Sequence, residues 1–288
     1  MKASRWRADL ALVAVCLIWG STFVLVKNAL QDISTVLFLA VRFTVATLAL
    51  LTVYALRRRS WRLAGWRAGL AVGAFLYLGY LLQTLGLRFT TAAKSGFITG
   101  LYIVLVPLLC AAVYKKAPGI SEWTGVMLAS LGLALLTLDT ASLRMGGGDL
   151  LTVGCAIAFA VHIVLNGHNA QRMESDWLAL LQIGACAVFA VSSFWWFEKP
   201  FVRWSGSVLV ALAVTSILAT AIALWIQTWA QKYTTPTRAA LVFSLEPVFA
   251  WLTSFLVADE RLTGRAVAGA ACILGGILLV ELKPIPSR

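Results

Sequence analysis

The side chains that could do chemistry in this 288-residue chain are a few polar residues at helical spacing within apolar stretches. His162 and Asn166 are four residues apart, and so are Gln227 and Gln231. Residues three or four apart share one face of an α-helix, so each pair belongs to a polar stripe. Amides, hydroxyls, an imidazole and aromatic rings together are suited to binding a small solute that has polar and apolar parts. The residues expected to line such a cavity are Trp19, Thr22, Tyr77, Tyr80, Thr84, Thr99, Tyr102, His162, Asn166, Trp225 and Gln227.

The elements that must position these side chains are membrane-spanning helices. Hydrophobic residues make up 60% of the chain and charged residues 12%, against roughly a half and a quarter in soluble proteins. The apolar blocks are about 20 residues long, which is enough to cross a hydrocarbon core as a helix. Helices also satisfy their own backbone hydrogen bonds in lipid. We therefore predict an all-α integral membrane protein.

The apolar blocks predict ten transmembrane helices with short loops. They are expected at residues 9–27, 34–56, 66–87, 92–114, 121–138, 149–168, 176–197, 206–231, 237–258 and 264–282. The side that carries both termini has 15 of the 24 lysines and arginines, and the other side has eight. Because Lys-rich and Arg-rich loops stay in the cytoplasm, both termini are expected there. The net charge of +12 serves this orientation, and no nucleic-acid partner is expected.

The polar stripes leave two interpretations open. A stripe within lipid must face protein or water, since its amides would otherwise lack hydrogen bonds. Stripe residues could join neighbouring helices through bonds of about 0.6 kcal/mol each. They could instead line a shared cavity. The first interpretation is favoured for any single residue, and the second for the whole set.

The sequence carries none of the common signatures of catalysis or nucleotide hydrolysis. It has no P-loop, no H-E-x-x-H and no G-x-S-x-G,. The five cysteines all lie in apolar blocks without a C-x-x-C spacing, so neither a disulfide framework nor a metal site is expected,. We expect no cofactor and no enzymatic activity. A membrane-embedded enzyme or a non-transporting membrane subunit remains the alternative to a transporter.

One polar phrase occurs twice in the chain. QTLGLRFTT begins at Gln83 and QTWAQKYTT at Gln227, 144 residues later. Other pairs are 140 residues apart, namely Asp9 and Asp149, Arg42 and Gln182, and Pro107 and Pro247. We interpret the chain as two five-helix units, at residues 1–140 and 146–283. Because five is odd, the second unit is inverted in the membrane, an arrangement typical of secondary transporters that bind substrate between their halves.

These motifs resemble a known family. WGSTFVLVKNAL in the first span, VRF in the second and FSLEPVFAWLTSFLVADERLTG near the end are similar to the EamA-type branch of the drug/metabolite transporter superfamily. The chain departs from the family after the fourth span, where YKKAPGIS replaces a usual acidic residue. The resemblance implies a bacterial inner-membrane exporter of metabolites, often amino acids or their derivatives. It implies transport by alternating access through a central cavity.

Two charged residues lie within predicted spans, and each has two interpretations. Burying the charge of Glu246 costs about 2.5–3.5 kcal/mol on insertion scales, so it should be partnered or protonated. Glu246 could couple transport to protons or bind a substrate amine, or it could satisfy backbone groups freed by Pro247. Arg42 could bind an anionic group, but a structural role at helix ends or an interface is favoured.

Three further residues could take part in a transport cycle. Pro107 and Pro247 predict kinks in the fourth and ninth spans, either as hinges or as fixed bends around a cavity. His162 could carry a proton near neutral pH or stay neutral and hydrogen-bonded. The expected partners are a small-molecule substrate and the lipid bilayer, with protons and a homodimer left open beside the monomer.

Overall fold

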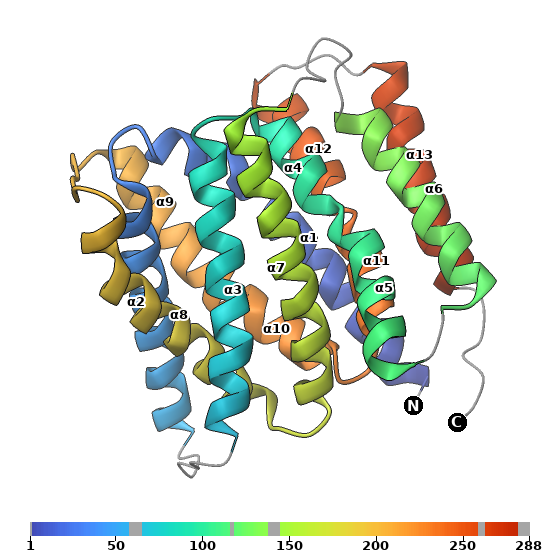
Figure 1. Cartoon of the computed structure of the whole chain (residues 1–288), viewed down its shortest axis with the longest axis horizontal. Helices are drawn as coiled ribbons and strands as arrows, with labels where there is room; N and C mark the ends of the chain where they lie inside the picture. Colours follow the sequence, from blue (N-terminus) through green and yellow to red (C-terminus); the bar gives the residue numbers. More distant parts are fainter. Residues whose placement is uncertain (1, 58–64, 116–117, 138–144, 259–262, 282–288) are drawn as a thin grey trace.

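The fold is described from a computed structural model, which covers residues 2–57, 65–115, 118–137, 145–258 and 263–281. Within these ranges every regular element is a helix, and strand pairing is limited to an isolated bridge between Ile33 and Val202. The prediction of an all-α chain is confirmed. The helices run side by side, tilted against one another (Figure 1).

The helices of the first half are α1 (Lys2–Ala29), α2 (Thr35–Leu56), α3 (Trp66–Leu87), α4 (Ala92–Gly100), α5 (Tyr102–Tyr114) and α6 (Ile120–Thr137). Those of the second half are α7 (Gly147–Ala170), α8 (Ser175–Phe197), α9 (Gly206–Ser216), a π-helix (Ile217–Ile222), α10 (Ala223–Ala230), α11 (Pro236–Phe243), α12 (Glu246–Ala258) and α13 (Gly264–Glu281).

Eight helical segments in the described ranges are long and apolar enough to cross a membrane. They fall on the first eight predicted spans. The apolar part of α13, Gly264–Val280, is shorter, and the predicted ninth span is divided into α11 and α12. The count of ten spans therefore stays a prediction.

Two predicted spans break on the N-terminal side of their prolines. The fourth divides at Leu101, six residues before Pro107, and the ninth at Ser244 and Leu245, just before Pro247. Pro247 lacks a backbone N–H and clashes with the carbonyl four residues earlier, that of Phe243, which is where α11 ends,. Pro107 instead lies inside α5, and nothing in its own geometry accounts for the break at Leu101. The sequence placed the bends at the prolines themselves, and the structure places the breaks before them.

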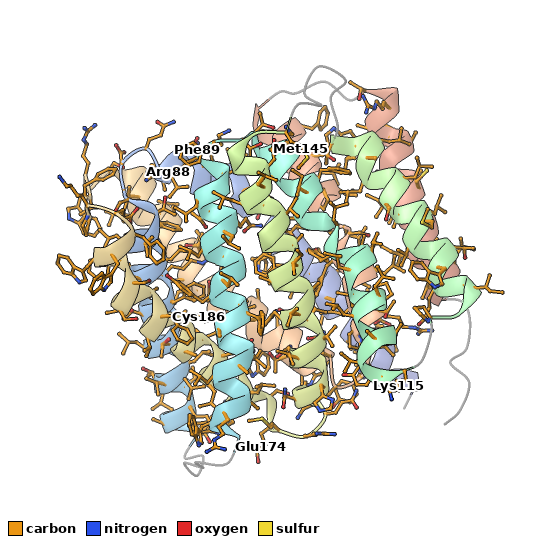
Figure 2. All side chains as sticks on the ribbon, viewed as in Figure 1. Arg88, Phe89, Lys115, Met145, Glu174 and Cys186 are labelled. Atoms are coloured by element: carbon orange, nitrogen blue, oxygen red, sulfur yellow. The ribbon has the colours of Figure 1, made fainter. Side chains whose placement is uncertain are left out.

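The two ends of the helices can be told apart by their labelled residues. Arg88, Phe89 and Met145 lie at one end, which we call the Met145 end, and Lys115 and Glu174 lie at the other, the Lys115 end (Figure 2). Helix α1 begins and α13 ends at the Lys115 end (Figure 1). The start of α1 and the end of α13 are thus on the same side of the molecule.

A carboxylate far away in the sequence caps the start of α2. Glu198, directly after α8, accepts hydrogen bonds from the backbone N–H groups of Thr35, Val36 and Leu37 at 3.0, 2.6 and 3.0 Å. The first N–H groups of a helix have no partner within it and carry partial positive charge, so a carboxylate there is stabilising. Glu198 thereby fixes the start of α2 against the end of α8.

Two clusters of apolar side chains form the core. One gathers around α2, α3 and α8 and includes Phe38 and Ile183, and the other gathers around α1, α7, α10 and α11 and includes Phe243. Trp19 of α1 and Phe159 of α7 pack against both clusters. These two aromatic residues therefore mark the boundary between the clusters.

Helices α6 and α13 approach each other through glycines at the edge of the molecule (Figure 1). A methyl group on Gly132 would lie 2.5 Å from the backbone oxygen of Gly269, and one on Gly125 would lie 2.8 Å from that of Gly276. Small residues let helix backbones approach closely, which is the main source of helix association in membranes. The close contact between α6 and α13 is therefore possible because glycine has no Cβ atom.

We expect Gly132→Ala to lower the thermal unfolding temperature in detergent, because the added methyl group must push α6 and α13 apart. Overpacking of this kind typically costs about 1–3 kcal/mol. Gly184→Ala is the matched control, since its methyl group would meet only Thr47, at 3.8 Å. Equal unfolding temperatures for the two variants would contradict the proposed role of the glycine contact.

Candidate functional site

A cavity of about 80 Å³ lies where the two apolar clusters meet. Its walls are mainly aromatic and aliphatic, with a few polar side chains from both halves of the chain. The lining residues are Trp19, Thr22, Phe23, Val26, Arg42, Leu76, Tyr80, Gln83, Thr84, Leu87, Thr99, Tyr102, Phe159, His162, Ile163, Leu224, Gln227, Phe243 and Glu246. We call this space the central cavity.

A second cavity of about 270 Å³ adjoins the first. It shares with the central cavity the residues Phe23, Thr99, Tyr102, Phe243 and Glu246. It extends to Leu136 and Thr137, the last residues of α6, and α6 ends at the Met145 end (Figure 1). The combined volume of the two cavities lies near the lower end of the range for small-molecule sites, which is about 300–1,000 Å³.

Most of the residues predicted from the polar stripes meet in the central cavity. Those that line it are Trp19, Thr22, Tyr80, Thr84, Thr99, Tyr102, His162 and Gln227, together with Arg42 and Glu246. They come from α1, α2, α3, α4, α5, α7, α10 and α12. Side chains that are far apart in the sequence therefore face one space between the helices.

Three predicted site residues line neither cavity, because each has a partner elsewhere. The hydroxyl of Tyr77 pairs with that of Ser193 on α8. The amide of Asn166 donates to Gln231. The indole N–H of Trp225 donates to the carboxylate of Asp176 at 2.7 Å, which turns the ring away from the cavity.

The cavity also has lining residues that the stripe analysis did not select. Phe159 and Phe243 form apolar walls, and no polar signal marks them out in a chain that is rich in apolar residues. Gln83 was marked by a signal, since it opens the first copy of the repeated phrase whose second copy begins at Gln227. Its amide nitrogen lies 3.4 Å from the hydroxyl of Thr99.

Two acceptor groups in the cavity have no partner among the residues that the structure describes. Glu246 is the first residue of α12, directly after the helix break, and borders both cavities. Among the described residues its carboxylate has no hydrogen-bond or ion-pair partner. The side-chain oxygen of Gln227 is buried and likewise unpaired within the described part of the chain. Both groups are free to accept hydrogen bonds from a solute.

Arg42 and Trp19 hold the π-helix from opposite walls. The Nε group of Arg42 donates to the hydroxyl of Thr220 at 2.7 Å, and the indole N–H of Trp19 donates to the backbone oxygen of Ala219 at 2.8 Å. The guanidinium of Arg42 also lies 4.5 Å from the centre of the Tyr80 ring, within reach of a cation–π interaction,. The positive charge is thus fixed at the cavity wall.

His162 points from the central cavity into a group of amides. Its Nε2 lies 2.8 Å from the side-chain oxygen of Gln182 on α8. Across the described ranges, no three His, Cys, Asp or Glu side chains gather into a group that could hold a metal ion. The arrangement is suited to binding a solute, with one cation, one carboxylate and amides set in apolar walls.

Comparison with known proteins identifies the family. The EamA-like transporter family matches two segments of the chain, residues 6–138 and 146–282. The chain belongs to this family. The resemblance inferred from the sequence motifs is confirmed, and the chain is a multi-pass membrane transporter.

Relatives of this transporter match along nearly its whole length. A protein named uncharacterized transporter from Archaeoglobus fulgidus is 37% identical over 282 residues, covering 97% of this chain and 87% of the relative. Uncharacterized transporter YvbV from Bacillus subtilis is 26% identical over 290 residues, covering 96% and 92%. A solved crystal structure shares the fold, with a TM-score of 0.79 and 21% identity over 96% of this chain and 97% of the other.

We expect the hydrogen bond between Arg42 and Thr220 to appear as a coupling energy in the transporter. Arg42→Lys and Thr220→Val should each destabilise the protein, and the double variant should lose less than the sum. Residues in direct contact typically show coupling of about 0.5–3 kcal/mol in the free energy of unfolding. Denaturant titration in detergent micelles measures the four proteins of the cycle.

The control cycle pairs Arg42→Lys with Thr215→Val. The hydroxyl of Thr215 bonds within its own helix, to the backbone oxygen of Ala211 at 2.6 Å. This cycle should be additive. Additive losses for Arg42 and Thr220 as well would show that the bond does not hold the π-helix.

Proposed function

We propose that the protein is a secondary active transporter that exports small metabolites across the bacterial inner membrane by alternating access. Its substrates are amino acids or related zwitterionic or aromatic compounds. The observation that carries the proposal is a cavity between the two halves of the chain that holds both a cation, Arg42, and an unpartnered carboxylate, Glu246.

The lining of the cavity supports this class of substrate. A zwitterion needs a cationic group for its carboxylate and acceptors for its ammonium group, and Arg42, Glu246 and Gln227 supply these. Trp19 and Phe159 supply the apolar surface that an aromatic or aliphatic side chain needs. Such apolar sites with a few polar groups are typical of small-molecule binding.

The glycine contacts between α6 and α13 support an inverted repeat. A shift of 144 residues carries Gly125 to Gly269 and Gly132 to Gly276. When each glycine is replaced by its counterpart in the other half, the Gly125–Gly276 contact becomes the Gly269–Gly132 contact. The repeated Gln-Thr phrase has the same offset. Two such contacts exchange in this way when two similar units face each other across a two-fold axis.

The distribution of charge supports cytoplasmic termini. Lys115 lies at the end of the molecule where α1 begins and α13 ends (Figures 1 and 2). Several of the counted cations lie outside the described residues, namely Arg58, Arg59, Arg62, Lys116, Arg144, Arg261, Lys283 and Arg288. The greater Lys and Arg content of the predicted loops on that side orients it toward the cytoplasm.

We expect purified protein in liposomes to exchange labelled amino acids in a counterflow assay. Gln227→Ala and Trp19→Ala should each lower the rate about tenfold, because a loss of about 1.4 kcal/mol of binding changes occupancy tenfold. The screen should include aromatic and aliphatic amino acids, their amine and acid analogues, and nucleobases. Amine-only and acid-only analogues test the separate contributions of Glu246 and Arg42.

Gln171→Ala and Trp196→Ala are the matched controls, since both residues are exposed and line neither cavity. Their exchange rates should equal that of the unaltered protein. Equal rates for all four variants would place the substrate elsewhere. No flux of any solute through the unaltered protein would instead favour a non-transporting membrane subunit.

A further inference from the structure

A buried polar cluster joins α7, α8 and α10 beside the central cavity. The side-chain oxygen of Gln182 on α8 accepts from His162 Nε2 at 2.8 Å, and its amide nitrogen donates to Thr228 at 2.8 Å and to Asn166 at 3.3 Å. The amide of Asn166 donates to the side-chain oxygen of Gln231. We call these five residues, His162, Asn166, Gln182, Thr228 and Gln231, the amide cluster.

The amide cluster lies on the Lys115 side of the cavity. Helix α7 ends at Ala170, α8 begins at Ser175 and α10 ends at Ala230, all toward the Lys115 end (Figure 1). The cluster therefore lies within about two helical turns of those helix ends. Each of its side chains is at most 2% exposed. The second cavity, by contrast, extends toward the Met145 end. The structure is therefore hollowed on one side of the cavity and packed with hydrogen-bonded side chains on the other.

The counterparts of the cluster in the first half all line the central cavity. An offset of 140 residues, as between Asp9 and Asp149, relates His162, Asn166 and Gln182 to the residues Thr22, Val26 and Arg42. An offset of 144 residues, as in the Gln-Thr phrase, relates Thr228 and Gln231 to Thr84 and Leu87. All five of these counterparts are lining residues. In the cluster itself His162 also lines the central cavity, whereas Asn166, Gln182, Thr228 and Gln231 do not. Four of the five related places are thus open in the first half and closed in the second.

We propose that the amide cluster is the gate that closes the cavity toward the Lys115 end, and that its side chains become the substrate-facing wall when this gate opens. In that second state the first-half counterparts close the Met145 end. The proposal rests on the proposed transport function and adds the residues that carry the substrate through the second half of the path.

The chemistry of the cluster suits a gate that opens to water. Hydrogen bonds between helices in membranes are individually weak, so a few of them can be exchanged within a transport cycle. When the gate opens, water and the substrate replace the lost partners of the amides, and no polar group is left in lipid.

Cysteine labelling tests the gate without any substrate. The five native cysteines are replaced with alanine, and a single cysteine is introduced as Val26→Cys or Asn166→Cys. An impermeant maleimide is then applied to either side of vesicles. Val26→Cys should react from the Met145 side, and Asn166→Cys should be protected from both sides.

Adding Gln182→Leu removes the central amide of the cluster. It should raise labelling of Asn166→Cys from the Lys115 side at least fivefold and lower that of Val26→Cys.

The control for the loosening variant is Ser130→Ala, which removes a hydroxyl that bonds within α6, to the backbone oxygen of Val126. It should leave both labelling rates unchanged. Unchanged labelling with Gln182→Leu, in protein that elutes as the unaltered protein does, would make the cluster a static support. If Gln182→Leu fails to fold, Thr228→Val loosens the same cluster and gives the same comparison.

A cross-link separates failure of the gate from failure of the transport function. On oxidation, the pair Asn166→Cys and Gln231→Cys should be cross-linked and lose the flux that the same double variant shows in its reduced form, and reduction should restore that reduced-form level. Flux that persists through the oxidised pair overturns the gate and leaves the transport function standing. Labelling that switches sides in a protein without flux for any solute keeps the gate and overturns the transport function.

Discussion

The structure depends on one constraint, which is that a polar side chain within a bilayer must find its partner inside the protein. Lipid offers no hydrogen bonds, so helices that carry amides, hydroxyls and charges must turn those faces toward one another. Gln182, Asn166 and Thr228 satisfy the constraint by bonding directly across three helices. Glu246 and Gln227 satisfy it by facing a cavity instead. Packing and binding site are therefore two outcomes of the same requirement.

The irregular backbone follows from the same constraint. Non-helical backbone is tolerated at membrane depth only where it is covered by protein or lines a water-filled space. The second cavity is lined by Gly100 and Tyr102, on either side of the break at Leu101, and by Phe243, Ser244 and Glu246 at the second break. The π-helix has its own support, since Arg42 and Trp19 both donate to it. Both helix breaks, which are tight turns in the αR region and not extended segments, thus border the second cavity.

The sequence was sufficient for the all-α class and for most of the polar lining of the cavity, because the first follows from the length of the apolar blocks and the second from helical periodicity. Apolar blocks identify helices, and polar residues three or four apart identify the faces that must meet. The same reasoning placed Tyr77, Asn166 and Trp225 in the cavity, where the structure does not put them. Their orientations are decided by Ser193, Gln231 and Asp176, partners 116, 65 and 49 residues away. No local pattern records such pairings. Phe159 and Phe243 could not be predicted for a different reason. In a chain rich in apolar residues, the sequence does not distinguish an apolar residue that lines a cavity from one that packs elsewhere.

The two halves differ at places that the repeat relates, so the two proposed gates are not equivalent. The first half has Val26 and Leu87 where the second has Asn166 and Gln231. A gate closed by hydrogen bonds and a gate closed by apolar contact have different stabilities, and a ligand shifts such an equilibrium only by its unequal affinity for the two states. Arg42 contributes the cation from the first half, and its counterpart Gln182 is neutral and tied into the amide cluster. A zwitterion bound between Arg42 and Glu246, as proposed, would have a defined orientation, with its carboxylate toward α2 and its ammonium group toward α12. Opening of the amide cluster would present neutral amides to a solute on the Lys115 side, the side from which the proposed exporter takes up its substrate.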